Sequence, residues 1–261
     1  MMSNSMLRIL LAITAVLYYA AFACSLFEKK AKLPTSLKYG FWVAGAAANA
    51  VAIVNNYFHN GHVPFISIFQ VLIVLGLCFV PFYLYLTYVC KCRGYFPVFS
   101  FASAIVLTGT AFMETNPESY YPPALQSPFF IPHVLVYMIA YCLGAVAFAL
   151  VVLSFFRKQK QKDLERAAYC CIRALFPFMT CGMFFGAIWA DQVWGDFWSW
   201  DIKENWSLVT WLLFMLYLHC YRRKLLKKYT RILAILGFVG IIITFFFVNV
   251  MNNTSSVHVY S

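Results

Sequence analysis

Eight apolar runs, separated by short polar connections, constrain what this 261-residue chain can fold into. Each run is near the ~20 residues that an α-helix needs to cross a hydrocarbon core of ~30 Å. The runs are continuous rather than alternately apolar and polar, which disfavours spanning β-strands. Hydrophobic residues make up 63% of the chain, more than a soluble core of this size could enclose.

The sequence therefore predicts an all-α polytopic membrane protein, with residues 1–261 forming a single membrane domain. The eight helices are expected at about 7–27, 38–58, 64–89, 97–113, 131–156, 168–190, 206–221 and 232–250.

The lysines and arginines indicate how these helices are oriented. Of the 20 basic residues, 18 follow the first, third, fifth and seventh runs, and the positive-inside rule places those connections in the cytoplasm. The formal charge of +11 is then a topology signal, with the anionic surface of the lipid bilayer as its partner. We expect no nucleic-acid partner, and both termini on the outer side. A bacterial cytoplasmic membrane is the expected location, and a thylakoid membrane is also compatible.

Tryptophan is concentrated in one segment, 189–211, with the sequence WADQVWGDFWSWDIKENWSLVTW. It holds six of the seven tryptophans, several times more than an interfacial aromatic belt supplies. Trp194 and Trp198 are four residues apart and share a face if the segment is helical. The acidic residues, Lys203 and Gly195 favour an external surface segment between the sixth and seventh helices. Flat apolar surfaces with a few polar anchors suit a large planar ligand bearing charged groups, either haem or a quinone.

Three histidines stand out as candidate metal ligands. His133 and His258 lie on the expected outer side and flank the tryptophan segment in sequence, and neutral imidazole is the commonest protein metal ligand. The alternative for each is an ordinary interfacial histidine. His219 lies 13 residues after Trp206, or roughly 20 Å along the seventh helix. An imidazole at that depth indicates either a functional site or a hydrogen bond to a neighbouring helix.

The stretch WGDFWSWDIKENWSLVTWLLFMLYLH resembles the WWD signature of haem-handling proteins of the CcsA/ResC type, which are subunits of System II cytochrome c synthases. The positions that carry the resemblance are Trp194, Gly195, Trp198, Trp200, Asp201, Lys203, Glu204, Trp206, Trp211 and His219. The sequence GHVPF around His62 is similar to a second family motif. There Ser67, Phe69 and Gln70 replace the usual Asn, Tyr and Glu, so His62 is the weakest of the residues carried over.

The resemblance implies a set of haem b sites. His133 and His258 would be the axial ligands of an outer haem, with the tryptophans, Asp201, Lys203 and Glu204 as its platform. His219 would ligate an inner haem, whose second ligand resides in a CcsB/ResB-type partner subunit. Which residue contacts the haem propionates stays open, and Lys203 is the only cation of the segment.

The function implied by the resemblance is that of a cytochrome c synthase subunit. It would deliver haem to the outer membrane face and present it for thioether attachment to an apocytochrome c carrying Cys-x-x-Cys-His. The protein would supply orientation, while the reactive chemistry belongs to haem and apocytochrome. Three alternatives remain at this point: a CcmC-like haem carrier, a HemX-like assembly or regulatory membrane protein, and a quinone-binding redox subunit.

Overall fold

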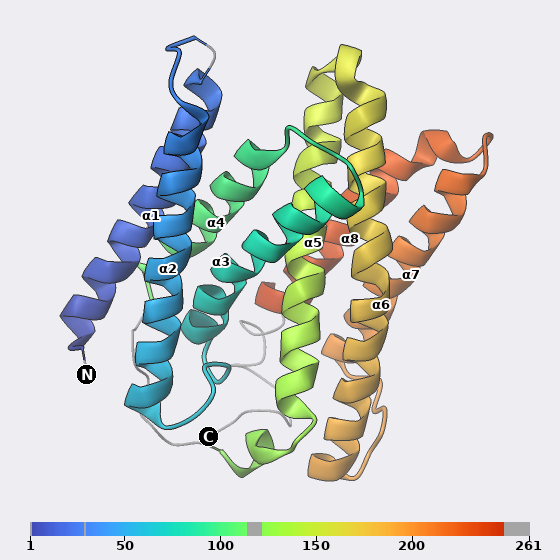
Figure 1. The fold of residues 1–261 in the computed structure, drawn as a ribbon. Helices are drawn as coiled ribbons and strands as arrows, with labels where there is room; N and C mark the ends of the chain where they lie inside the picture. Colours follow the sequence, from blue (N-terminus) through green and yellow to red (C-terminus); the bar gives the residue numbers. More distant parts are fainter. Residues whose placement is uncertain (1, 29, 114–121, 248–261) are drawn as a thin grey trace. The chain divides into compact units, whose positions relative to one another are not determined.

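The computed structural model describes residues 2–28, 30–113 and 122–247, and these residues form helices and connections without a β-strand (Figure 1). The α-helices among these described residues are α1 Asn4–Phe27, α2 Thr35–Asn60, α3 Ile68–Leu84, α4 Phe96–Thr110, α5 Phe130–Phe156, α6 Gln161–Trp194, α7 Ile202–Arg222 and α8 Thr230–Ile242. Each overlaps one of the eight predicted runs. Short π-helical turns extend α3 over Tyr85–Val89 and α8 over Ile243–Phe247.

Six of these helical segments are long and apolar enough to cross a membrane: α1, α2, α3 with its π-helical turn, α5, α6 and α8 with its flanking turns. This confirms the class of all-α polytopic membrane protein. The helix α4 has only 15 residues, and α7 has 21 but carries charged residues in its first and last turns. That α4 and α7 also span the bilayer therefore stays a prediction.

The helix α6 differs most from its expected bounds, because it covers Gln161–Trp194 rather than 168–190. Its extra turns carry polar residues at both ends. They therefore lie beyond the continuous apolar run from which the helix bounds were predicted. Gly195 ends the helix in the left-handed region at φ 80°, a conformation that suits glycine. Pro177 lies inside α6 without ending it.

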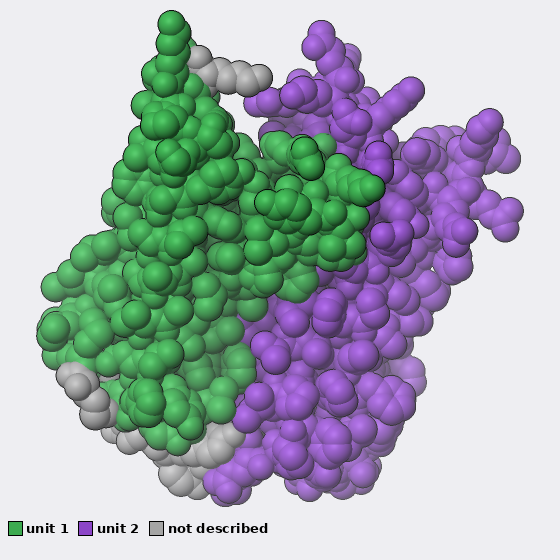
Figure 2. Space-filling model, in the orientation of Figure 1, with its two compact units in different colours: residues 1–121 green, residues 122–261 purple. Residues whose placement is uncertain are grey.

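The chain divides into two compact units, Met1–Tyr121 and Pro122–Ser261, which are coloured separately in Figure 2. The prediction of a single membrane domain is not tested by this division. In the first unit α1 packs against α2 and α4, and α3 packs against α4 and α2.

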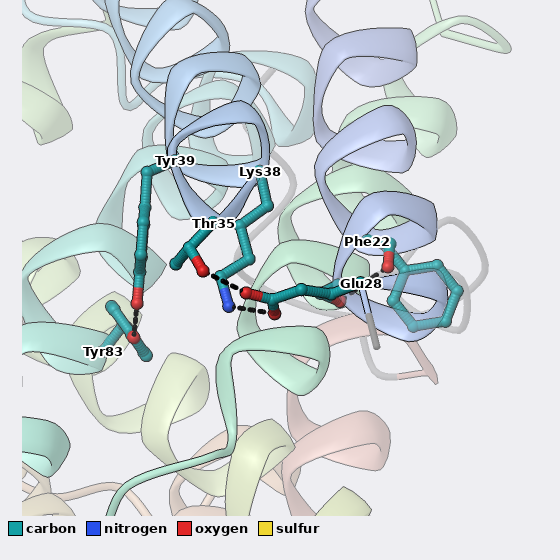
Figure 3. Close-up of polar contacts among 7 residues, drawn as sticks. Phe22, Glu28, Thr35, Lys38, Tyr39 and Tyr83 are labelled. Carbon is teal, nitrogen blue, oxygen red and sulfur yellow. Dashed lines mark hydrogen bonds and ion pairs between the residues drawn. The ribbon is translucent and has the colours of Figure 1, made fainter. Parts of the chain in front are cut away.

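The α1–α2 connection of the first unit carries a compact polar cluster (Figure 3). Glu28 accepts hydrogen bonds from the Thr35 hydroxyl and the Lys38 ammonium, which also lies 5.2 Å from the centre of the Tyr39 ring. The Tyr39 and Tyr83 hydroxyls are 3.1 Å apart and join α2 to α3. The cluster neutralises one of the cations in a connection that the sequence predicts to be cytoplasmic.

The second unit is an antiparallel arrangement in which α5 packs along α6, α6 contacts α7, and α8 lies against α5 and α7. Close approach depends on glycines that face large side chains. A Cβ at Gly237 of α8 would lie 2.7 Å from the Phe214 ring, and one at Gly144 of α5 would lie 2.6 Å from Ile241. Because neighbouring helices alternate in direction, the start of α5, the end of α6 and the start of α7 lie at one end of this unit (Figure 1).

Candidate functional site in the second unit

His133 lies in the first turn of α5, partly exposed, and its ring orientation is fixed by α6. Its Nδ1 lies 2.8 Å from the carbonyl oxygen of Gly182. A carbonyl oxygen can only accept, so Nδ1 carries the hydrogen, and Nε2 of the neutral ring keeps its lone pair. This is the arrangement in which histidine ligates a metal: one nitrogen donates to a carbonyl and the other is left for the ion.

Aromatic side chains surround the His133 imidazole. Its ring centre lies 5.0 Å from that of Tyr137 and 5.6 Å from that of Trp189, and Trp189 in turn lies 5.1 Å from Phe130 and 5.1 Å from Trp194. The predicted platform residue Trp194 and the predicted ligand His133 are therefore joined through one intervening indole. The sequence did not single out Trp189 for this role, since its place beside His133 depends on the α5–α6 register.

Trp189 also holds the segment that precedes α5. Its indole Nε1 donates to the carbonyl oxygen of Ala124 at 2.7 Å, in the 3₁₀ turn Pro123–Gln126. One turn further along α6, the Ser127 hydroxyl donates to the Gln192 side-chain oxygen at 2.8 Å. The last turns of α6 are thus fastened both to His133 and to the chain that leads into α5.

The connection between α6 and α7 is shorter than the helix bounds predicted from the sequence, so the tryptophan segment 189–211 is divided among three elements. Its first residues belong to α6 and its last to α7, so that only residues 195–201 connect the two helices. Trp194 and Trp198 do not share a helical face, because Gly195 ends α6 between them. Trp198 and Trp200 form an edge-to-face pair with ring centres 5.9 Å apart, and Trp200 is 65% exposed.

Trp200 adopts a left-handed conformation, with φ 59°. Such a conformation costs roughly 1–2 kcal/mol for a residue that carries a Cβ. The Asn205 side chain donates to the Trp200 carbonyl oxygen at 2.7 Å and stabilises this conformation from the first turn of α7. The strain falls on the most exposed indole of the connection, and strained backbone of this kind is typical of functional sites.

Asp201 and Glu204 form a capping box at the start of α7. The Glu204 amide donates to Asp201 Oδ1 at 2.8 Å, and the Asp201 amide donates to Glu204 Oε2 at 3.2 Å. Glu204 Oε2 also accepts from the Ser199 amide at 2.8 Å and from the Ser199 hydroxyl at 3.3 Å. The two acidic side chains of the signature are therefore engaged with the backbone of the connection and fix its shape.

Lys203 is the cation of this end of the unit and precedes the span expected at 206–221. It is partly exposed, and in the part of the chain that the structure describes no carboxylate lies within ion-pair distance of its ammonium. Burial lowers its pKa, and the negative charge of Asp201 partly offsets that shift. Its charge also acts on the His133 imidazole. An anionic group arriving between them would stabilise the ammonium.

Trp206 and Trp211 belong to α7, and Trp211 lies away from the connection. It is ten residues after Asp201, or roughly 15 Å along the helix. The Trp211 ring stacks on Phe176 with centres 5.1 Å apart, and its Nε1 donates to the Thr180 hydroxyl at 2.9 Å. The structure therefore places Trp211 in the α6–α7 contact rather than with the tryptophans of the connection.

His219 lies in the last turns of α7 and is exposed on this unit, on the same face as Leu212 and Leu216. An exposed imidazole among apolar residues of a predicted span calls for a covering partner, since lipid offers it no hydrogen bond. His258 lies outside the described residues. In the π-helical turn after α8, Phe245 packs against Tyr141, which lies eight residues, or roughly 12 Å, along α5 from His133.

His62 belongs to the first unit, in the connection between α2 and α3, where its Nδ1 lies 3.1 Å from the Val63 carbonyl oxygen. Just beyond it, Ser67 and Gln70 form a capping box that starts α3. Two of the three substitutions noted after GHVPF, Ser67 and Gln70, thus keep this helix start, because Asn at the cap with Glu three residues later provides the same hydrogen bonds.

The donor set fits an iron porphyrin better than a bare ion. Among residues 2–28, 30–113 and 122–247, no three His, Cys, Asp or Glu side chains lie close enough to hold a metal ion. Haem iron needs only one or two protein ligands, since the porphyrin occupies four positions. The free Nε2 of His133, the adjoining indoles and the Lys203 ammonium provide a ligand, flat apolar surfaces and a cation for a carboxylate.

The fold and the site together define a multipass helical membrane protein in which an imidazole held by a backbone carbonyl lies beside a tryptophan-rich connection. The sequence profile of the cytochrome c assembly protein family matches residues 65–256, and the chain belongs to that family. The predicted resemblance to the CcsA type is thereby confirmed.

Curated relatives agree with the family. The chain is 27% identical to the cytochrome c biogenesis protein CcsA of Nymphaea alba over 241 residues, covering 76% of this chain and 78% of the relative. It is 28% identical to the protein of the same name from Guillardia theta, covering 95% and 92% of the two chains. A third, from Chlamydomonas reinhardtii, is 35% identical over 184 residues, covering 61% of this chain and 50% of the relative.

Proposed function

We propose that this chain is the haem-binding subunit of a membrane cytochrome c synthase, which presents haem b for covalent attachment to apocytochrome c. The observation that carries the proposal is the His133 imidazole, held through Nδ1 by Gly182 and leaving Nε2 available at a tryptophan-rich end. Membership of the cytochrome c assembly protein family supports the same function. The prepared ligand favours haem over a quinone, which has no metal to ligate.

In this proposal the haem is a substrate held at the outer end of the second unit. His133 is one axial ligand, and His258 is the other. Trp194, Trp198, Trp200 and Trp206 provide flat contact surfaces. Asp201 and Glu204 act indirectly, since their carboxylates hold the backbone of the connection. Trp211 supports the platform indirectly, from the α6–α7 contact in which it stacks on Phe176.

Lys203 is the residue that we assign to the haem propionates. It is the cation of the site, it has no carboxylate within ion-pair distance among the described residues, and burial lowers its pKa. A propionate beside Lys203 would restore the ammonium with a charge-assisted hydrogen bond. The acidic residues of the connection would repel that carboxylate, and their hydrogen bonds to the backbone leave Lys203 as the anchor.

His219 would serve an inner haem at the other end of α7. Its exposure on this unit fits a ligand that is completed from outside, and we assign the second ligand to a CcsB/ResB-type subunit. His62 is a further, weaker candidate for haem contact from the first unit. The direction of haem transfer follows from the predicted topology, with the basic connections in the cytoplasm and the tryptophan connection outside.

The reaction requires little acid–base chemistry from this chain. Haem supplies two vinyl groups, and each cysteine thiol of Cys-x-x-Cys-His adds its S–H across one vinyl C=C, forming a C–S bond without net oxidation. His133 and His258 hold the substrate and saturate its iron, which limits side reactions. The histidine of the apocytochrome then replaces one of them. Orientation, ligation and exclusion of water are thus the contributions of this protein.

The proposal is tested by co-expressing the chain with a CcsB-type subunit and a Cys-x-x-Cys-His apocytochrome in bacteria that lack their own cytochrome c maturation system. Covalent haem on the apocytochrome, measured by haem-dependent peroxidase staining after denaturing electrophoresis, is expected with the wild type. It should disappear with His133→Ala and persist with His59→Ala, a matched change of an exposed histidine at the end of α2.

Two outcomes count against the proposal. Covalent haem that persists with His133→Ala would remove His133 from the reaction. A wild-type chain that reaches the membrane and binds haem, yet attaches none to the apocytochrome, would be a haem carrier rather than a synthase subunit.

A further inference from the structure

The α5–α6 register seats two large aromatic rings of α5 against two glycines of α6. A Cβ at Gly186 would lie 2.6 Å from both Cε1 and Nδ1 of His133, and a Cβ at Gly182 would lie 2.7 Å from the Tyr137 ring. His133 and Tyr137 are one turn apart on α5, and Gly186 and Gly182 are one turn apart on α6. The two pairs follow one antiparallel register.

The same register continues along the helices with the roles reversed. Two turns further on, Gly144 of α5 faces Leu175 of α6, where a Cβ would lie 3.3 Å from the leucine side chain. The helices therefore pack with a large residue opposite a glycine at each of these levels. Without these gaps the imidazole of His133 could not approach the backbone of α6.

That close approach permits the hydrogen bond between His133 Nδ1 and the Gly182 carbonyl oxygen, at 2.8 Å. The acceptor is a backbone atom of a long helix, so its position does not depend on a side-chain rotamer. Tyr137 packs edge-on against His133, with ring centres 5.0 Å apart. Packing and hydrogen bonding thus limit rotation of the imidazole from three sides.

We propose that Gly182 and Gly186 are positioning residues for the haem ligand: Gly186 makes room for the His133 ring, and the Gly182 carbonyl fixes its Nδ1–H tautomer. Nε2 is then the ligating atom, with its lone pair presented before haem arrives. The inference rests on the proposed function only in calling His133 a haem ligand. A carbonyl partner on the far nitrogen also raises the basicity of the ligand, and loss of such partners typically costs 10–100-fold in metal affinity.

The first test needs no haem. The chain is prepared from haem-depleted cells with ring-¹⁵N histidine and placed in lipid nanodiscs, and the His133 signals are identified by their loss in His133→Ala. Nitrogen NMR should show one neutral tautomer, with hydrogen on Nδ1. A hydrogen on Nε2, or an averaged mixture of both tautomers, would overturn the positioning role.

The second test compares Gly186→Ala with Gly109→Ala, whose Cβ would meet only Leu72 at 3.9 Å. In the full chain loaded with haem, Gly186→Ala should lower haem retention by about 10–100-fold, and added imidazole should restore the low-spin absorption spectrum. The midpoint potential of any haem retained without imidazole should rise, because a less basic ligand stabilises ferric iron less. Equal behaviour of the two variants would refute the proposal.

These tests separate the two proposals. If the wild type never binds haem, the proposed function fails, while the tautomer of His133 still decides whether α6 positions the ring. If haem binds through His133, but the ring hydrogen is on Nε2 or Gly186→Ala leaves haem retention unchanged, only the positioning role fails.

Discussion

Replacing Glu204 by alanine removes the acceptor that holds the tryptophan connection to α7. Its Oε2 accepts from the Ser199 amide at 2.8 Å, the Asp201 amide at 3.2 Å and the Ser199 hydroxyl at 3.3 Å. The Asp201 cap itself survives, because Asp201 accepts its hydrogen bond from the backbone amide of residue 204, which alanine also provides. We therefore expect local loosening of the connection and an intact α7.

The size of the effect follows from the two amide bonds. Hydrogen bonds to a charged group contribute about 1.5–3 kcal/mol when buried, and partial exposure lowers this to about 1 kcal/mol each. Losing both should therefore destabilise the closed connection by about 2 kcal/mol, which corresponds to an exchange rate about 30-fold faster at the Ser199 and Asp201 amides. The strained Trp200 between them loses the same support.

Hydrogen exchange of the full chain in nanodiscs, followed by mass spectrometry, measures this directly. Glu204→Gln is the matched control, because its side-chain oxygen still accepts while the charge is gone, and we expect only about five-fold faster exchange. Unchanged exchange in Glu204→Ala would refute the account of the connection. Equal acceleration in both variants would show that Glu204 acts through its charge rather than as a fixed acceptor.

Three further predictions follow from single residues. Trp200→Gly should relieve the left-handed strain and raise the free energy of unfolding by up to about 1 kcal/mol. It should also weaken haem retention, because an exposed indole is lost; an unchanged haem content would exclude Trp200 from the platform. Lys203→Met should release haem about five-fold faster, a change of about 1 kcal/mol for a partly exposed pair. Because burial lowers the pKa of Lys203, its attraction for a propionate is present below that pKa and is lost as the pH rises through it. Lys203→Arg should retain haem over the whole pH range, because arginine stays charged. Identical pH profiles of haem retention in the wild type and in Lys203→Arg would contradict this. Gly237→Ala places a Cβ 2.7 Å from the Phe214 ring and should destabilise by about 1–3 kcal/mol in denaturant titrations, whereas Gly109→Ala should not; equal stabilities would refute the packing argument.

Most of the helical framework could be predicted from hydrophobic runs alone, since a lipid-exposed backbone must satisfy its own hydrogen bonds. The first and last residues of a helix were harder to predict where the helix extends beyond the apolar run. The first turns of α6, from Gln161, are polar, and its last turn mixes Asp191 and Gln192 with Val193 and Trp194, so neither end continues the apolar run. Two local signals did mark the connection: Gly195 as a helix stop, and Asp201 followed by Glu204 as a helix start.

The chemistry of the site was only partly readable from the sequence. The residue types made His133 a candidate ligand and Lys203 the only cation of the segment, and the family resemblance implied that His133 ligates haem; these assignments stay predictions. The partner of His133 could not be predicted, because Gly182 lies 49 residues away and meets it only through the α5–α6 register. The same holds for Trp189, whose neighbours are set by tertiary packing rather than by sequence spacing.

The most direct test of the central claim is the absorption spectrum of the detergent-purified chain from haem-replete cells, compared with His133→Ala and with His59→Ala. The account predicts a low-spin b-type spectrum in the wild type that His59→Ala retains. In His133→Ala the haem should be lost or become high-spin, and added imidazole should restore the low-spin form. A His133→Ala chain that keeps the wild-type spectrum without added imidazole would contradict the assignment of His133 as a haem ligand.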